Sequence, residues 1–127
     1  MNKISVLLKV FFHIFNMMLI FFYLYPGSLF GYFLYGDIKK QPEITSDFLN
    51  ISSNHFFVFV LLSILGILAY FRDKNISLVI RYLFLLSITL ELFHIILPAR
   101  AFQYEDLFGN ILGTSLILIF YKILKQN

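Results

Sequence analysis

The sequence has no cysteine, and only 13% of its 127 residues are charged. The missing cysteine excludes disulfides, thiolate metal sites and cysteine nucleophiles, so any chemistry must come from histidine, carboxylate, arginine or hydroxyl groups. Soluble domains carry roughly a quarter charged residues, and the shortage of charge therefore excludes a water-soluble enzyme, a disordered tail and a conventional nucleic-acid-binding module. The chain is instead 60% hydrophobic, with a mean hydropathy of +0.84. This composition predicts a protein of the lipid bilayer.

Four apolar stretches are long enough to cross a bilayer. A spanning helix needs roughly 17–25 mostly apolar residues, because each adds about 1.5 Å toward a hydrocarbon thickness of about 30 Å. The sequence shows no alternating, strand-length segments of the barrel type, and backbone polar groups must find partners inside the bilayer, so the spans are expected to be helices. We predict a single all-α integral membrane domain over residues 1–127, with four transmembrane helices at residues 4–25, 55–71, 76–97 and 107–124.

Basic residues near the predicted helix ends set the expected orientation, because Lys and Arg concentrate in cytoplasmic loops. Three of them lie on one side of the membrane: Lys39, Lys40 and Arg100. Seven lie on the other side: Lys3, Lys9, Arg72, Lys74, Arg81, Lys122 and Lys125. The count predicts a multi-pass membrane protein with both termini in the cytoplasm. Residues 26–54 and 98–106 would then form the outer loops, and the aromatic part of the first loop is expected to lie at the membrane interface.

Polar side chains that could carry chemistry gather toward the outer ends of the predicted helices. An ionisable group inside a membrane is costly, so its position is informative. The set comprises Glu91 and His94 in the third span, Asp106 and Asn110 in the fourth, Arg100 in the turn between them, and His55 at the start of the second. Glu91 and His94 are three residues apart and Asp106 and Asn110 are four apart, so the two members of each pair lie on one face of their helix. All six side chains are therefore expected at the outer leaflet.

Two interpretations of these residues remain open from the sequence. In a structural interpretation Glu91 pairs with Arg100, Asp106 caps the fourth helix and Asn110 bonds to a neighbouring helix. In a functional interpretation the buried carboxylate belongs to an active or binding site, where such groups are common. The Glu-x-x-His spacing of Glu91 and His94 also occurs in metal-binding helical bundles. The sequence has no second such pair, so we expect no metal and no other cofactor.

The same residues carry a resemblance to a known family. Along the second half of the chain the order is Glu91-x-x-His94, Pro98-x-Arg100 and Asp106-x-x-x-Asn110-x-x-Gly113. This succession resembles the signature of the VanZ-like membrane protein family, in which Glu-x-x-Gln is followed by Pro-x-Arg and Asp-x-x-x-Asn-x-x-Gly. His94 stands where the family has glutamine. In the first half His55 matches the histidine of the family's Asp-Lys-x-x-His motif, whereas Ile51 and Ser52 replace its acid and base.

The resemblance implies a small bacterial inner-membrane protein with four helices. The named member of the family is associated with low-level resistance to the glycopeptide teicoplanin, and the resemblance supplies no defined reaction. It therefore leaves open whether this chain is an enzyme.

Two functions from different classes follow. In the first, the outer cluster binds a membrane lipid or a lipid-linked anionic precursor of the cell envelope. Arg100 would contact the anion, because a guanidinium offers paired donors to phosphate, with Asn110 and His55 as further ligand contacts. Glu91, His94 and Asp106 would be the catalytic candidates, since they can move protons. In the second function, the chain is a non-catalytic accessory subunit of a larger envelope or export assembly, with a membrane protein or another copy of itself as partner.

Overall fold

The computed structural model describes residues 3–43 and 45–126, and its regular structure is helical. The helices are α1 Lys3–Leu24, α2 Leu29–Tyr35, α3 Ser53–Tyr70, α4 Ile76–Phe93 and α5 Tyr104–Gln126. Four of these, all except α2, are long and apolar enough to cross a membrane. The predicted class, an all-α membrane protein with four spans, is therefore confirmed, and the chain is a multi-pass membrane protein.

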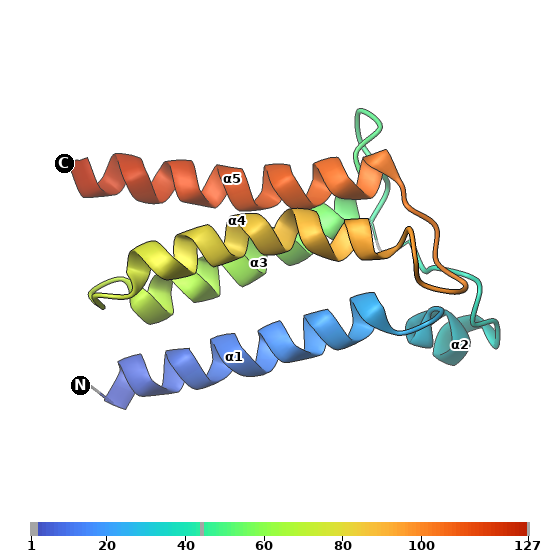
Figure 1. Cartoon of the computed structure of the whole chain (residues 1–127), viewed down its shortest axis with the longest axis horizontal. Helices are drawn as coiled ribbons and strands as arrows, with labels where there is room; N and C mark the ends of the chain where they lie inside the picture. The colour runs from blue at the N-terminus through green and yellow to red at the C-terminus, as the bar shows by residue number, and fades with distance from the viewer. Residues whose placement is uncertain (1–2, 44, 127) are drawn as a thin grey trace.

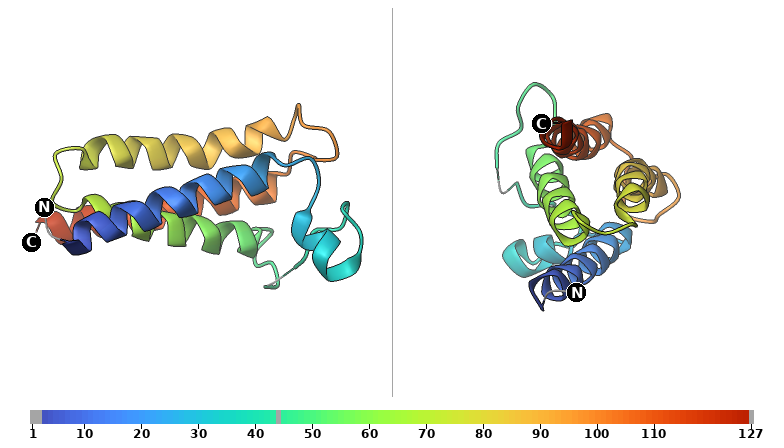
Figure 2. Two further views of the ribbon diagram at one scale, coloured as in Figure 1. Left: turned by 90° about the horizontal axis from the view of Figure 1, so that it is seen from below. Right: turned by 90° about the vertical axis from the view of Figure 1, so that its left-hand side faces the viewer.

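The four long helices form a bundle in which consecutive spans run in opposite directions, so α3 and α5 run parallel (Figure 1). Helix α3 packs against each of the other three, and α4 also packs against α5 and α1. Viewed along the bundle, the four helices surround a common axis, and α2 lies beyond the end of α1 (Figure 2). The first residues of α1 and the last of α5 lie at the same end, together with the turn between α3 and α4. The two longer connections, before α3 and before α5, therefore share the opposite end.

The predicted helix boundaries are right for the first two spans to within two residues and less accurate for the other two. The third span was expected to reach Leu97 but ends at Phe93, and the chain continues in a turn. Pro98 disfavours helical backbone at the residue before it. In this turn the backbone N–H groups of His94, Ile95 and Ile96 each donate to the carbonyl oxygen three residues earlier. These bonds replace the four-residue spacing of the α-helix with a tighter turn. The fourth helix begins at Tyr104, three residues before the predicted start.

The short helix α2 occupies the aromatic part of the first outer loop, where no helix was predicted. Its N-cap is Ser28, whose Oγ accepts a hydrogen bond from the Gly31 N–H at 2.9 Å. Its C-cap is Gly36, which has a φ of 69° and terminates the helix in the left-handed conformation. Phe33 is 79% exposed. Large aromatic side chains on a short helix at this end agree with a location at the membrane interface.

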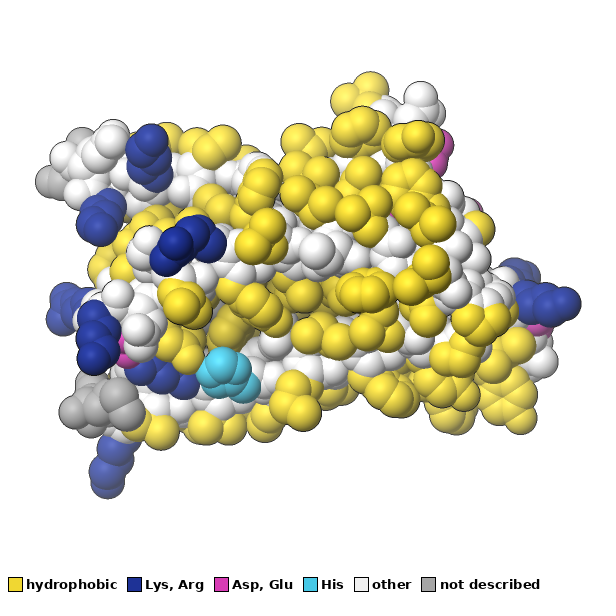
Figure 3. Space-filling model, in the orientation of Figure 1, with side chains coloured by type: hydrophobic (Ala, Val, Ile, Leu, Met, Phe, Trp, Pro, Cys, Tyr) yellow, Lys and Arg dark blue, Asp and Glu magenta, His cyan; other side chains and the backbone are white. Residues whose placement is uncertain are grey.

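The outward surface of the bundle is apolar along the length of the spans. Figure 3 shows hydrophobic side chains covering the middle of the molecule, with most Lys and Arg side chains at the end that carries the termini. The fully buried core between the helices includes Phe59, Leu62 and Leu83. A molecule with an apolar exterior as well as an apolar core is suited to a hydrocarbon solvent, in which spanning helices satisfy their own backbone groups.

Helices α3 and α5 approach each other closely along two glycines of α5. A Cβ atom at Gly109 would lie 2.6 Å from the Ser52 carbonyl oxygen, and one at Gly113 would lie 2.4 Å from the Phe56 carbonyl oxygen. Small residues four apart allow backbones to meet in this way in membrane bundles. The close approach brings the first turn of α3 beside the first turns of α5, where the polar residues lie.

Candidate functional site

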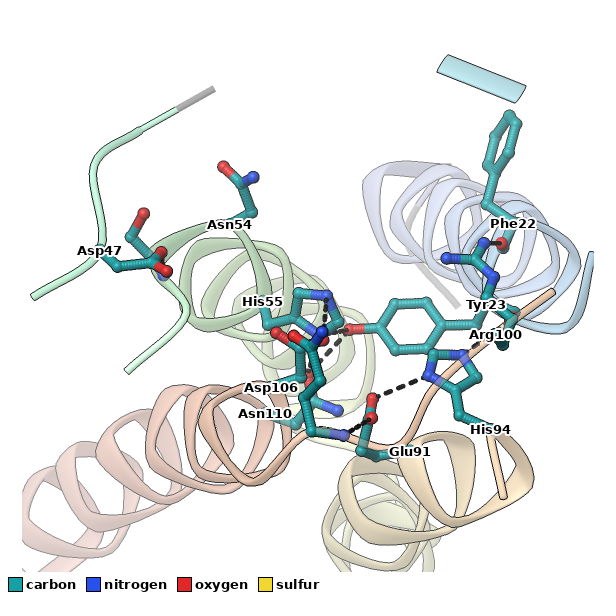
Figure 4. A network of polar contacts seen from close by, with 12 residues as sticks. Phe22, Tyr23, Asp47, Asn54, His55, Glu91, His94, Arg100, Asp106 and Asn110 are labelled. Atoms are coloured by element: carbon teal, nitrogen blue, oxygen red, sulfur yellow. Dashed lines mark hydrogen bonds and ion pairs between the residues drawn. The ribbon is translucent and has the colours of Figure 1, made fainter. Parts of the chain in front are cut away.

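Polar side chains from all four spanning helices meet at the end of the bundle opposite the termini (Figure 4). The last turn of α1 supplies Tyr23, the first turn of α3 supplies His55, and the first turns of α5 supply Asp106 and Asn110. Glu91 comes from the last turn of α4, and His94 directly follows that helix. All of the sequence-predicted site residues lie in or beside this cluster, with Arg100 at its edge.

Tyr23 joins α1 to α3 and α5 through its hydroxyl group. The hydroxyl donates to Asn110 Oδ1 at 2.8 Å and lies 2.7 Å from His55 Nδ1. His55 Nδ1 also lies 3.2 Å from Asn110 Oδ1. With the Asn110 oxygen on this side, the tautomer that satisfies both contacts is the one in which His55 Nδ1 carries the proton and donates it. The other ring nitrogen, Nε2, faces Asp106 Oδ2 at 3.5 Å.

Glu91 is fully buried and is held from two directions. Its Oε1 accepts a hydrogen bond from the Gln103 backbone N–H at 3.0 Å, and its Oε2 lies 3.1 Å from His94 Nδ1. The other nitrogen of His94, Nε2, lies 3.0 Å from the Tyr23 carbonyl oxygen, which can only accept. Nε2 therefore carries a proton, and an attractive contact between His94 Nδ1 and Glu91 requires a second proton on the imidazole ring. The geometry at Oε2 is not that of a hydrogen bond, so this contact is an ion pair when His94 is protonated.

Arg100 does not form the expected pair with Glu91. Its Nη2 donates to the Phe22 carbonyl oxygen at 2.7 Å and its Nε to the Tyr25 carbonyl oxygen at 3.2 Å. The guanidinium therefore caps the carboxyl end of α1, where a cation is favoured by the helix dipole. Burial lowers the pKa of the Arg100 guanidinium from its usual value, and nearby acidic groups oppose that shift. These two bonds use two of its five N–H groups.

The structural interpretation is right for Asn110, which bonds to neighbouring helices, and needs revision for Asp106. Asp106 lies in the first turn of α5 and faces His55 across the helix interface, so it links two helices in addition to standing near a helix N-terminus. Asn110 is fully buried and bonds to side chains of both α1 and α3. Both residues therefore serve the packing of the bundle and the cluster at once.

Sequence reasoning missed Tyr23 and Gln103. A tyrosine near the end of an apolar helix resembles a membrane-interface anchor, and the sequence contains no pattern that distinguishes the two roles. Gln103 contributes a backbone N–H, which every residue other than proline possesses. A signal for Tyr23 existed only in its location at the outer end of its helix, level with the other polar groups.

Two adjoining cavities open beside the cluster. One, of about 310 Å³, is mostly apolar and lies between α1 and α3, with walls that include Phe15, Met18, Leu19, Phe22 and Val58. The other, of about 550 Å³, is polar and lies under the outer loops, with Lys39, Asp47 and Asp106 among its lining residues. The two cavities share five lining residues: Gln41, Pro42, Asn54, His55 and Arg100. An apolar and a polar cavity therefore adjoin at one end of the bundle.

The fold and the cluster define a four-span α-helical membrane protein with a buried polar site near one membrane surface. No protein-family profile, curated protein or solved structure matches the chain. The resemblance to the VanZ-like family therefore stays an expectation that rests on the motif residues themselves.

Proposed function

We propose that this chain is a VanZ-like protein of the bacterial inner membrane that binds an anionic lipid or lipid-linked cell-envelope molecule in the outer leaflet. The observation that supports this proposal is the pair of adjoining cavities, one apolar and one polar, which share His55 and Arg100. An acyl or isoprenoid chain fits the apolar cavity, because its walls are side chains of spanning helices. The polar cavity suits an anionic head group.

The charge distribution supports the orientation in this proposal. Most Lys and Arg side chains gather at the end of the bundle that carries Lys3 and Gln126. Basic residues concentrate on the cytoplasmic side of membrane proteins, so the polar cluster and both cavities would open toward the outer surface. A molecule that is displayed in the outer leaflet could then enter between α1 and α3.

The polar cavity contains groups that recognise an anion. Arg100 lines it and has N–H groups beyond the two that bond to the end of α1, and Lys39 lines the same cavity. Guanidinium groups bind phosphate oxygens through paired, charge-assisted hydrogen bonds. The acidic residues Asp47 and Asp106 lie in the same cavity, and they favour a ligand that also carries hydroxyl or amine donors.

A lipid-binding assay on the purified protein tests this function. We expect native mass spectrometry in detergent to show a bound polyprenyl phosphate or phosphatidylglycerol and much weaker binding of uncharged diacylglycerol. Arg100→Ala should weaken binding of the anionic lipids at least tenfold. Arg72→Ala, which removes an arginine from the opposite end, is the matched control and should bind as the wild type does. Equal binding of charged and uncharged lipids, or no effect of Arg100→Ala, would contradict the proposal.

Turnover distinguishes an enzyme from a binding protein. The carboxylate–imidazole contacts of Glu91 with His94, and of Asp106 with His55, suit general acid–base chemistry on a bound substrate. If the protein is an enzyme, Glu91→Gln should abolish release of product from a lipid-linked phosphate and leave lipid binding within a few-fold of wild type. A protein that binds the lipid without any turnover is a binding protein.

The alternative role, an accessory subunit of a larger assembly, is favoured by the network that ties α1, α3 and α5 together. Tyr23, His55 and Asn110 connect three helices through buried contacts, as expected for a purely structural cluster. Mild-detergent purification from the native membrane distinguishes the roles. A stoichiometric protein partner together with absent lipid selectivity would support the accessory role.

The VanZ-like resemblance also proposes a phenotype. Expression in a teicoplanin-sensitive bacterium should raise the inhibitory concentration of teicoplanin, and Glu91→Ala or Arg100→Ala should remove the protection at equal amounts of membrane protein. If the wild type gives no protection, this protein does not confer teicoplanin resistance. The lipid-binding proposal is tested separately by the lipid-binding assay.

A further inference from the structure

A second kind of ligand is indicated by three side chains that the fold brings together from separate helices. His55 of α3, Glu91 of α4 and Asp106 of α5 each offer one nitrogen or oxygen atom, and these atoms all lie within 4.8 Å of one another. From the sequence we expected no metal, because the Glu91-x-x-His94 pair has no second counterpart. The structure supplies the additional ligand atoms from other helices instead.

The donor set suits a first-row divalent cation. Imidazole nitrogen together with carboxylate oxygen is a common zinc environment, with bonds of about 2.0–2.2 Å. Such bonds set the ligand atoms of a tetrahedral zinc ion roughly 3.4 Å apart, and His55 Nε2 and Asp106 Oδ2 are already 3.5 Å apart. The Glu91 carboxylate, which comes from the facing helix, has an oxygen within 4.8 Å of both atoms.

The hydrogen bonds around His55 leave its metal-binding nitrogen available. His55 Nδ1 lies next to the Tyr23 and Asn110 oxygens, and Nε2 faces Asp106 at 3.5 Å. With the proton on Nδ1, the Nε2 lone pair and the Asp106 carboxylate present two ligand atoms to one cation. Metal-binding histidines characteristically donate their other N–H to a neighbouring acceptor, which fixes the ring orientation. Tyr23 and Asn110 fill that role here.

Glu91 provides an independent indication of a cation. Its side chain is fully buried, and its Oε2 receives no hydrogen bond among the described residues. The His94 contact at 3.1 Å offers a charge partner only when His94 is protonated. Two carboxylates, Glu91 and Asp106, therefore approach one another at the end of a membrane bundle, where an uncompensated charge is costly. A divalent cation between them compensates both.

The polar cavity gives such a cation a route of entry and a free coordination position. His55 and Asp106 both line that cavity, together with Gln103, whose backbone N–H holds Glu91 in place. We propose that His55, Glu91 and Asp106 form a binding site for a divalent transition-metal cation, best suited to Zn²⁺, with an exchangeable position that faces the polar cavity. This site does not depend on lipid binding, although a head-group oxygen could occupy its open position.

Cobalt titration of the purified, chelator-treated protein without added lipid tests the site. We expect one Co²⁺ per chain, with visible absorption bands of low symmetry that Zn²⁺ displaces. Glu91→Gln and Asp106→Asn, which preserve side-chain volume, should each weaken binding at least tenfold, and so should His55→Gln. His13→Gln is the control, because it removes a histidine that bonds to Tyr70 elsewhere in the bundle, and it should bind cobalt as the wild type does.

Two results would overturn the proposal: no saturable Co²⁺ or Zn²⁺ binding to the wild type up to millimolar concentration, or binding that survives all three substitutions. A readout on the wild type alone guards against variants that do not fold. Pulsed electron paramagnetic resonance of the bound Cu²⁺ or Mn²⁺ form should detect a single histidine nitrogen, and the absence of any histidine coupling would contradict the site. Failure of metal binding with retained selectivity for anionic lipids would leave the proposed function intact.

Discussion

Gly113 of α5 lies against the backbone of Phe56 in α3, so closely that a Cβ atom at this position would be 2.4 Å from the Phe56 carbonyl oxygen. This contact sets the distance between the two helices that supply His55, Asp106 and Asn110. The geometry of the polar cluster therefore depends on a residue that has no polar side chain.

Gly113→Ala should destabilise the bundle and disturb the cluster. The new methyl group would meet a backbone atom that cannot move without separating the helices, and overpacking of this kind costs about 1–3 kcal/mol. Gly66→Ala is the matched comparison and should cost less, because its Cβ would meet the flexible ends of Phe12 and Leu83 at 3.0 and 3.1 Å. Equilibrium unfolding in mixed detergent measures both. If Gly113→Ala and Gly66→Ala lower the free energy of unfolding equally, the backbone contact at Gly113 is not the rigid one that we expect.

Tyr23→Phe should lower stability and weaken ligand binding together. The substitution removes the hydroxyl that bonds to Asn110 and approaches His55, and leaving a buried polar group unsatisfied costs about 1–3 kcal/mol. Tyr82→Phe is the control, since it removes a single hydrogen bond to Asn16 within the bundle. Both variants should lose stability, but only Tyr23→Phe should reduce binding of anionic lipid. If Tyr82→Phe reduces lipid binding equally, the effect comes from stability alone.

Val58→Phe should block the apolar cavity. Val58 lines the cavity between α1 and α3, and the larger ring would occupy part of its volume of about 310 Å³. We expect at least a tenfold loss of polyprenyl phosphate binding in native mass spectrometry, with little change in the unfolding midpoint. Leu61→Phe places the same ring on an exposed part of α3, where it should leave binding unchanged. Unaltered binding by Val58→Phe would place the lipid chain elsewhere.

Asp73 should titrate below the usual range of a carboxyl group. Lys9 donates to its Oδ2 at 2.5 Å, and this bond, together with one from the Asn75 N–H, lowers the pKa of Asp73 from 3.8. A depressed pKa in the folded state means that the ion pair adds stability above the pKa of the unfolded chain and loses it as the pH falls through the folded value. Carbon-13 NMR of the carboxyl group should show the low midpoint.

The Lys9→Met variant completes that measurement. Removing the ammonium should move the Asp73 midpoint back toward 3.8, because the main cause of the shift is lost. Lys74→Met, which removes a more minor contributor, should move it less. An Asp73 midpoint that is the same in the wild type and in Lys9→Met would show that the two groups do not pair in solution.

The sequence by itself determined the class of the protein. Long apolar runs can be satisfied only as spanning helices in a bilayer, so the four spans followed from hydropathy and length. The positions of Glu91, His94, Asp106 and Asn110 along the predicted spans placed them at one end of their helices. Their spacing placed them on one face of each helix, because helical periodicity is a local property of the sequence. The end of α4 was predicted four residues too late, since the apolar character of the chain continues past Phe93 while the backbone turns before Pro98.

The tertiary structure decided which groups meet. Arg100 is directed at the carbonyl oxygens of Phe22 and Tyr25, about 75 residues earlier in the chain, and this choice depends on where α1 ends in space. Tyr23 enters the cluster for the same reason, and His55, Glu91 and Asp106 converge because three helices pack at fixed distances. Sequence patterns report local periodicity and solvent preference, whereas contacts between distant segments depend on packing, which only the folded chain defines.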